Sequence, residues 1–166
     1  MKNVLFSILL ATIGSLSMAQ TPFTEATPSV IAAKNKAMTL KYYSQFNDHN
    51  PESPKCFAVD FVDRINPAVK GPEHIRAFNE TMYKTWPDVK VTVEQIVAEG
   101  DYVMARCTAT ATHTTEVMGV KPTNKKVEIT HWVVHHFNKD GLISESWSMN
   151  DNAALMQQLG LLGAKK

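Results

Sequence analysis

Hydrophobic and polar positions repeat with two different periods along this chain, and the period changes near residue 90. Before that point, apolar residues recur every three or four positions, which is the spacing of amphipathic helices. Two helical faces follow from this spacing: Ala33, Ala37, Leu40, Tyr43 and Phe46 form the first, and Ile75, Phe78, Met82 and Trp86 form the second. The first part of the chain is therefore predicted to be helical.

Proline-containing pairs predict where these helices begin and end. Proline favours the first helical position and cannot continue a helix, so it occurs at both boundaries. The predicted starts are Thr27-Pro28 and Gly71-Pro72, and the predicted ends are Pro51 with Pro54 and Pro87-Asp88. A further short helix is predicted between them, from Phe57 to Val62.

From Val91 onward the period is two, which is typical of strands with one buried face. Four strands are predicted: Val91 toward Glu99, Tyr102 to His113, Val127 to Phe137, and Leu142 to Met149. Turns are predicted at Gly100-Asp101 and at Asn138 to Gly141, and a last helix from Ala153 to Leu162, ended by Gly163. Helices followed by a run of antiparallel strands predict an α+β fold.

The first 19 residues have the pattern of a secretory signal peptide rather than of a folded element. Lys2 is followed by an apolar run from Val4 to Leu16 and by small residues up to Ala19. These are the three regions that a signal peptidase recognises, so we expect cleavage near Ala19 and export to the periplasm or the medium. The alternative is a retained N-terminal helix. Residues 20–29 are predicted to be a flexible lead-in, and residues 30–166 a single domain.

Charge and cysteine content narrow the function classes. Removal of Lys2 with the signal peptide leaves 16 basic and 16 acidic residues, so the mature protein has no net charge. This balance argues against a nucleic-acid partner and against a membrane partner of the mature form. Cys56 and Cys107 are too few for a disulfide framework, and a small buried thiol is the simpler interpretation of Cys107. The sequence has no dinucleotide fingerprint, Gly-rich phosphate loop or Gly-x-Ser-x-Gly motif, so no cofactor is expected.

Several short motifs, each weak alone, together resemble one family. They are Asp60-Phe61-Val62, Gly71-Pro72-Glu73, Trp86-Pro87-Asp88, Thr112-His113-Thr114, Pro122-Thr123 with Lys125, Glu145-x-Trp147-x-x-x-Asp151, and Gln158-Leu159-Gly160. In this combination the chain resembles the SnoaL-like polyketide and ester cyclases of the nuclear transport factor 2-like superfamily. The resemblance implies a cone-shaped α+β barrel, in which a strongly curved antiparallel sheet packs on N-terminal helices around an interior cavity.

Asp151 is the first candidate catalytic residue. The resemblance implies that an Asp at this position is the acid/base of an intramolecular aldol ring closure. A carboxyl group that faces an apolar cavity has a raised pKa, because desolvation disfavours its charged form, and could then exchange protons with a substrate. The alternative is structural: Asp151 precedes Asn152-Ala153-Ala154 and could cap the last helix.

His131 and His135 are the other candidate catalytic residues. They lie four positions apart on one predicted strand, so they share a face with Val133, whereas His136 faces the opposite side. At about 3.3 Å per residue they are about 13 Å apart, too far for both to bind one metal ion, and no metal is expected. They could orient or polarise a substrate, or they could be packed core histidines.

Four more residues, together with Val133, are assigned to the substrate pocket. Asp60 is interpreted as a second pocket carboxylate or as an ion-pair partner of Arg64. Arg106 could bind an anionic group or pair with a carboxylate across the sheet. His113 is expected to pin the following loop by a hydrogen bond, and Trp147 to supply pocket wall or core.

Two functions remain open for the chain. The first is an exported enzyme that isomerises or cyclises a small, largely apolar carbonyl compound without a cofactor. The second is a non-catalytic module that binds a small apolar molecule in the same cavity. The strand face that carries Trp132, Val134 and His136 would also suit a homodimer.

Overall fold

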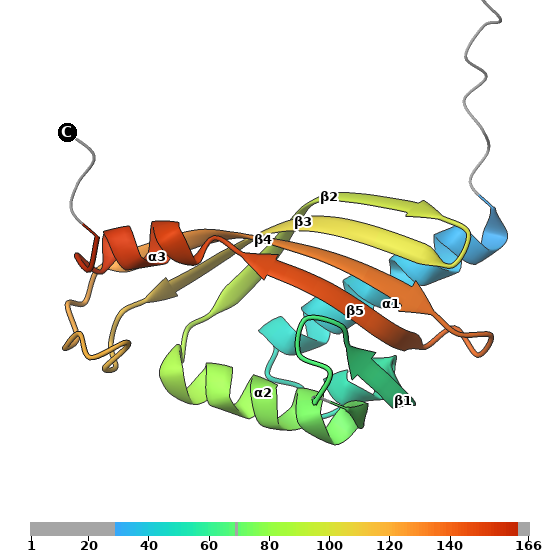
Figure 1. Cartoon of the computed structure of the whole chain (residues 1–166), viewed down its shortest axis with the longest axis horizontal. Coiled ribbons are helices and arrows are strands. Elements are labelled where there is room, and N and C mark those ends of the chain that lie inside the picture. The colour runs from blue at the N-terminus through green and yellow to red at the C-terminus, as the bar shows by residue number, and fades with distance from the viewer. Residues whose placement is uncertain (1–28, 69, 163–166) are drawn as a thin grey trace, which may run out of the picture.

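The computed structural model describes residues 29–68 and 70–162. The predicted signal peptide, nearly all of the predicted lead-in and Gly163 lie outside the described residues. Within them, three α-helices, a short 3-10 helix and five strands follow one another along the chain (Figure 1): α1 Val30–Asn47, η1 Ser53–Cys56, β1 Phe57–Asp63, α2 Gly71–Thr85, β2 Lys90–Glu99, β3 Tyr102–Thr112, β4 Lys126–Phe137, β5 Ile143–Asn150 and α3 Asn152–Gln158.

The sheet has the strand order β1-β5-β4-β3-β2 and curls around the first two helices (Figure 1). Helix α1 packs on β2 and β3, helix α2 on β1, and the short α3 on β4. The α+β class and the strongly curved sheet are therefore confirmed, although the sheet is curled rather than closed into a barrel. Its concave face and the helices enclose the interior.

One strand differs from the predicted layout. Residues Phe57–Asp63 form strand β1, not the predicted helix over Phe57 to Val62, and β1 runs parallel to β5, which makes the sheet mixed rather than antiparallel. The register between β1 and β5 is irregular between Phe57 and Val62. Phe57 and Phe61 are both buried, and a four-residue spacing fits one face of a strand as well as one face of a helix, so the spacing alone could not distinguish the two.

Helix α1 begins later and faces differently than predicted. Its N-cap is Ser29, whose side chain accepts a hydrogen bond from the Ala32 backbone N–H, so the start is not at Thr27-Pro28. The predicted positions Tyr43 and Phe46 are buried, but Ala33, Ala37 and Leu40 are exposed. Asn35 and Thr39 are buried in their place. Their polar groups are satisfied, because Thr39 Oγ1 donates to the Asn35 carbonyl and Asn35 Nδ2 donates to the Gly100 carbonyl.

The remaining predicted elements are present with small shifts. Helix α2 begins at Gly71, and β2 to β5 match the predicted strands to within two residues at each end. Helix α3 ends at Gln158, earlier than the predicted Leu162. In the described part of the chain, no helix combines the length and the apolar character needed to cross a membrane.

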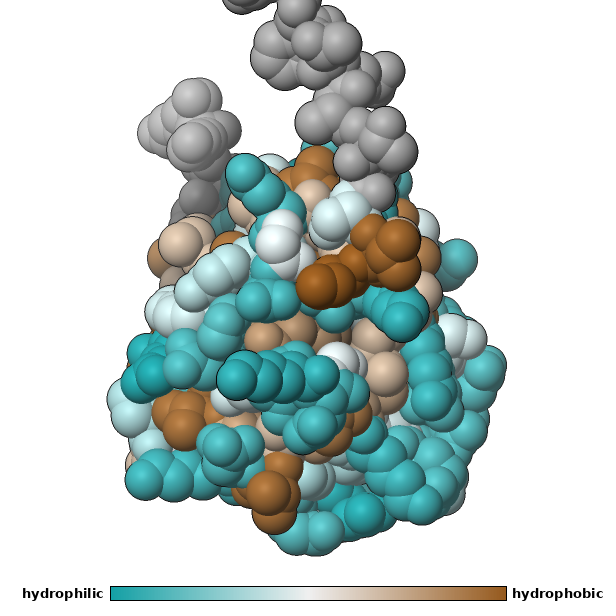
Figure 2. Space-filling view, turned by 90° about the vertical axis from the view of Figure 1, so that its right-hand side faces the viewer, coloured by the Kyte–Doolittle hydropathy of each residue, from teal (hydrophilic) through white to brown (hydrophobic). Residues whose placement is uncertain are grey.

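The core occupies the concave side of the sheet. Cys56 and Cys107 are buried there as free thiols, in agreement with the interpretation of Cys107 as a small core residue. The outside is more polar. Figure 2 shows the end of the molecule at which α1 begins: hydrophilic residues cover most of it, and hydrophobic residues form separate small groups. This end is therefore not a continuous apolar surface.

Candidate functional site

A cavity of about 330 Å³ lies between the concave face of the sheet and the helices. This volume falls at the lower end of the range typical of small-molecule sites, about 300–1,000 Å³. Residues from nearly every element line it: Tyr42, Tyr43, Phe46, Phe57, Phe61, Asp63, His74, Ile75, Phe78, Met82, Trp86, Val89, Val91, Ala109, Ile129, His131, Val133, His135, Ser146, Ser148, Asn150, Asn152 and Leu155.

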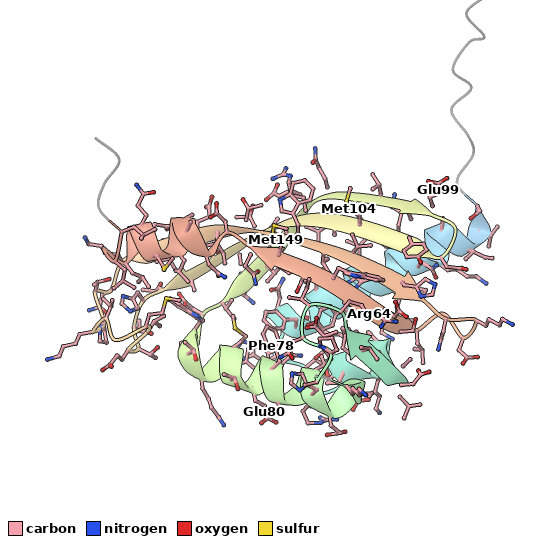
Figure 3. All side chains as sticks on the ribbon, viewed as in Figure 1. Arg64, Phe78, Glu80, Glu99, Met104 and Met149 are labelled. Atoms are coloured by element: carbon pink, nitrogen blue, oxygen red, sulfur yellow. The ribbon has the colours of Figure 1, made fainter. Side chains whose placement is uncertain are left out.

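The lining has an aromatic side and a polar side. The rings come from α1, β1, α2 and the residue that follows α2, and Phe78 lies between α2 and β5 (Figure 3). The polar groups come mainly from β4 and β5, where cross-strand pairing places His135 beside Ser146, and His131 beside Asn150. A ligand in this cavity would therefore contact apolar rings on one side and hydrogen-bonding groups on the other.

His135 is the most deeply buried polar group of the cavity. The residue is 3% exposed, and its Nδ1 lies 2.7 Å from Ser146 Oγ. Its Nε2 is buried and has no hydrogen-bond partner. Desolvation, with a smaller contribution from His131, lowers the pKa of His135 from 6.5 to about 3. The ring is therefore neutral near pH 7.

His131 is hydrogen-bonded to one buried and one exposed residue of the cavity lining. Its Nδ1 lies 2.8 Å from Asn150 Oδ1, and its Nε2 lies 3.2 Å from the Tyr43 hydroxyl. Since the amide oxygen can only accept, Nδ1 carries the proton and Nε2 accepts from the Tyr43 O–H. Burial lowers the pKa of His131 as well, although the hydrogen bond to Asn150 opposes the shift. The prediction that His131, Val133 and His135 share one cavity-facing side is confirmed.

The structure corrects the expected position of Asp151. Its side chain is exposed and caps α3, accepting a hydrogen bond of 2.9 Å from the Ala154 backbone N–H. The neighbouring residues Asn150 and Asn152 line the cavity, but Asp151 does not. The prediction that this carboxylate faces an apolar interior is therefore wrong, and the alternative of a helix cap is confirmed.

Asp60 and Arg106 also lie outside the cavity. Asp60 is exposed on β1, and the expected partner Arg64 instead forms an ion pair with Glu145, which lowers the pKa of that carboxyl. Arg106 lies on the outer face of the sheet, where its Nε donates to Gln95 Oε1 at 3.1 Å. Neither residue fills the predicted pocket role, because strand alternation turns each away from the concave face.

His113 has the loop-pinning role that was predicted for it. It is fully buried, and its Nδ1 lies 3.0 Å from Thr123 Oγ1, while its backbone carbonyl accepts from the Thr123 and Asn124 backbone N–H groups. It does not line the cavity. The prediction that Trp147 supplies pocket wall or core is wrong. Trp147 pairs with Val134 on the outer face of the sheet.

Several polar residues that line the cavity in the structure were not assigned to the pocket from the sequence. Ser146, Ser148 and Asn150 alternate along β5 and share the cavity face, a spacing that was visible in the sequence. Asp63 gave no comparable signal, since its position depends on the irregular β1 pairing. Among residues 29–68 and 70–162, no group of three or more His, Cys, Asp or Glu side chains could hold a metal ion.

The comparisons with known proteins agree with this fold. The family model of the SnoaL-like polyketide cyclases matches residues 37–159. The chain is similar to AclR from Streptomyces galilaeus, a proposed hydroxylase, with 30% identity and a TM-score of 0.73 over 81% of this chain and 90% of that one. It is also similar to IdmH from Streptomyces antibioticus, a proposed polyketide cyclase, with 30% identity and a TM-score of 0.68 over 76% and 98% of the two chains.

A third solved structure supports the fold alone. It is a SnoaL-like polyketide cyclase protein from Jannaschia sp. CCS1, with 23% identity and a TM-score of 0.71 over 83% of this chain and 99% of that one. No curated protein matches the chain significantly. The fold, the cavity and the match over most of the chain define the class, and the chain belongs to the SnoaL-like polyketide cyclase family.

Proposed function

We propose that this protein catalyses a cofactor-independent acid–base isomerisation or cyclisation of a small, largely apolar carbonyl compound. The observation that carries the proposal is the buried, unpartnered Nε2 of His135 in a cavity walled by aromatic rings. A buried polar atom without a partner costs free energy, which a ligand group can recover by hydrogen bonding to it. Family membership supports the same chemistry.

The neutral ring of His135 suits one side of such a reaction. When Ser146 donates its hydroxyl proton to Nδ1, the proton of the ring is on Nε2, and His135 is one of the residues that line the cavity. There it can donate to a carbonyl oxygen and stabilise the negative charge that develops when a neighbouring C–H is deprotonated. Water is largely excluded from this position, so the hydrogen bond is stronger than it would be in solution.

The proposal is tested by deuterium exchange. Two compact aromatic ketones, 2-tetralone and 1-indanone, are incubated with the protein in deuterated buffer, and loss of the α-proton signals is followed by NMR. We expect the wild-type protein to accelerate exchange and His135→Asn to lose about 100-fold of that acceleration. His136→Asn is the matched control, because His136 lies on the opposite face of the same strand, against Tyr102 and Ser144.

A non-catalytic binding module in the same cavity is the second candidate. It is favoured by the position of Asp151, since the carboxylate to which the family resemblance assigns the acid/base role is exposed and caps a helix. The same experiment separates the two functions. Saturable binding of both ketones without accelerated exchange would support the module and contradict the enzyme.

Export and dimerisation belong to the same proposal. Export is supported by the charged, apolar and small-residue regions of residues 1–19, and the mass of the mature protein would show whether cleavage falls near Ala19.

A homodimer is supported by the large apolar side chains exposed on the outer face of the sheet, which include Trp132 and the labelled Met104 and Met149 (Figure 3). A monomeric mass in light scattering would contradict the dimer.

A further inference from the structure

The cavity contains a carboxylate that the sequence did not indicate. Asp63, the last residue of β1, is the only Asp or Glu among the residues that line the cavity in the described part of the chain. The lining there includes no Lys or Arg, so no cationic side chain of the cavity neutralises Asp63. Asp60, the carboxylate predicted for this role, is exposed on the same strand three residues earlier.

Asp63 and His135 lie at the two ends of one row across three neighbouring strands. Asp63 of β1 pairs with Ser146 of β5, and Ser146 pairs with His135 of β4. Strands are about 4.8 Å apart, so the Cα atoms of Asp63 and His135 are about 10 Å apart. Because paired residues point to the same side of a sheet, Asp63 and His135 both line the cavity, one on each side of Ser146.

The carboxylate is held in one orientation by the backbone. Its Oδ1 accepts hydrogen bonds from the Ile65 N–H at 2.8 Å and from the Asn66 N–H at 3.2 Å. Both hydrogen bonds fall on Oδ1, so Oδ2 is the oxygen that can face a ligand. Asp63 is half-buried, whereas His135 is almost fully buried. Solvent therefore reaches Asp63 and can exchange a proton with its carboxyl group after each turnover.

We propose that Asp63 is the catalytic carboxylate of this cavity, and this inference rests on the proposed function. Asp63 removes a proton from the carbon next to the substrate carbonyl, and the C–H electron pair forms an enolate whose oxygen is hydrogen-bonded by His135 Nε2–H. In a cyclisation the enolate carbon then bonds to a second carbonyl carbon, and Asp63 returns its proton to the new alkoxide. In an isomerisation, Asp63 returns the proton to a different carbon.

The competing interpretation is that Asp63 only stabilises the turn after β1. A carboxylate at the end of a strand often accepts hydrogen bonds from backbone N–H groups two and three residues later, without any catalytic role. Asp63→Asn separates the two interpretations, because the amide oxygen can accept the same two hydrogen bonds from Ile65 and Asn66. The substitution therefore preserves the turn and removes the base.

The first measurement is deuterium exchange of 2-tetralone and 1-indanone. We expect Asp63→Asn to lose about 100-fold or more of the wild-type acceleration while unfolding at the wild-type temperature. Asp60→Asn is the matched control on the same strand, and Asp151→Asn is the control for the carboxylate that caps α3. Both are expected to keep wild-type exchange. Asp63→Glu, which restores a carboxylate, is expected to recover part of the activity even if the turn is disturbed.

The second measurement is binding of 2-naphthol, a planar compound whose oxygen can occupy the position of the enolate oxygen at His135. Asp63→Asn is expected to bind it several-fold more tightly than the wild-type protein, because the partial negative charge of the bound oxygen no longer faces a carboxylate. An Asp63 carboxylate that is turned away from the ligand would leave this affinity unchanged.

The outcomes distinguish this inference from the proposed function. If the wild-type protein accelerates exchange and Asp63→Asn does so equally, the role of Asp63 is refuted while the proposed function stands. If 2-naphthol binds but the wild-type protein accelerates the exchange of neither ketone, the proposed function is refuted, and the role of Asp63 with it.

Discussion

Mild acidification is expected to destabilise this protein through His135. The folded protein holds the pKa of His135 at about 3, whereas the unfolded chain has the ordinary value of 6.5. Between these two values the unfolded state binds a proton that the folded state does not, so the free energy of unfolding falls as the pH falls. The contribution of His135 is complete above pH 6.5 and is lost progressively toward pH 3.

The size of the effect follows from the same two values. The full interval between a pKa of 6.5 and one of about 3 corresponds to about 5 kcal/mol, at about 1.4 kcal/mol per pH unit. At pH 5, about 2 kcal/mol of this is already lost. His131, whose pKa is also lowered by burial, acts in the same direction. Asp88 and Glu145 have lowered pKa values too, but their contributions are lost only near and below pH 4.5.

The assay is urea unfolding at pH 7.5, 6.5, 5.5 and 5.0, followed by tryptophan fluorescence. His135→Asn keeps a polar partner for Ser146 and removes the titrating ring, so the loss of stability between pH 7.5 and 5.0 should be about 2 kcal/mol smaller than in the wild-type protein. His136→Asn is again the control. An equal pH dependence in all three proteins would refute the conclusion that burial keeps His135 neutral.

Three further substitutions test other parts of the structure. Asp151→Ala should lower the free energy of unfolding by about 1 kcal/mol in urea titrations through loss of the α3 cap, and should leave ketone exchange unchanged. Gly71→Ala should cost about 1 kcal/mol or more in the same titration, because Gly71 has a φ of +72° and an added Cβ would lie 3.2 Å from the Val59 carbonyl oxygen. The double substitution His135→Leu with Ser146→Ala removes a buried polar group that lacks a partner, so thermal unfolding should show no loss of stability at pH 7.5, while NMR should show loss of exchange.

The sequence was sufficient for most of the fold because its strands alternate regularly. The β4 alternation placed His131, Val133 and His135 on one face, and the structure has them there. Prediction failed where a second interaction overrides the local pattern. Phe57 and Phe61 are four residues apart, a spacing that fits one face of a helix or of a strand, and the pairing with β5 decides that the segment is extended.

The candidate site was harder to predict because its carboxylates are placed by elements that lack a regular period. Asp60 and Asp63 lie on the same short strand, and only the pairing of Asp63 with Ser146 shows which of them shares the cavity face. Asp151 lies at the junction of β5 and α3. Its neighbour Asn150 lines the cavity, whereas Asp151, one residue later, caps the helix. A motif match fixes the residue type at such a junction, but it does not fix the direction of the side chain.

The distribution of polar groups in the cavity is itself an argument for function. A cavity that served only packing would be lined by apolar side chains, because each buried polar atom without a partner lowers stability. Here β4 and β5 supply a row of hydrogen-bonding groups to an otherwise aromatic interior, and the most buried of them, His135, keeps one nitrogen without a partner. The free energy that this arrangement costs in the empty protein can be recovered by a ligand that brings a polar atom to Nε2 and apolar surface to the rings. The cavity is therefore adapted to a molecule that combines a carbonyl-like oxygen with an apolar body, and the half-buried Asp63 faces that molecule from the open end of the same row.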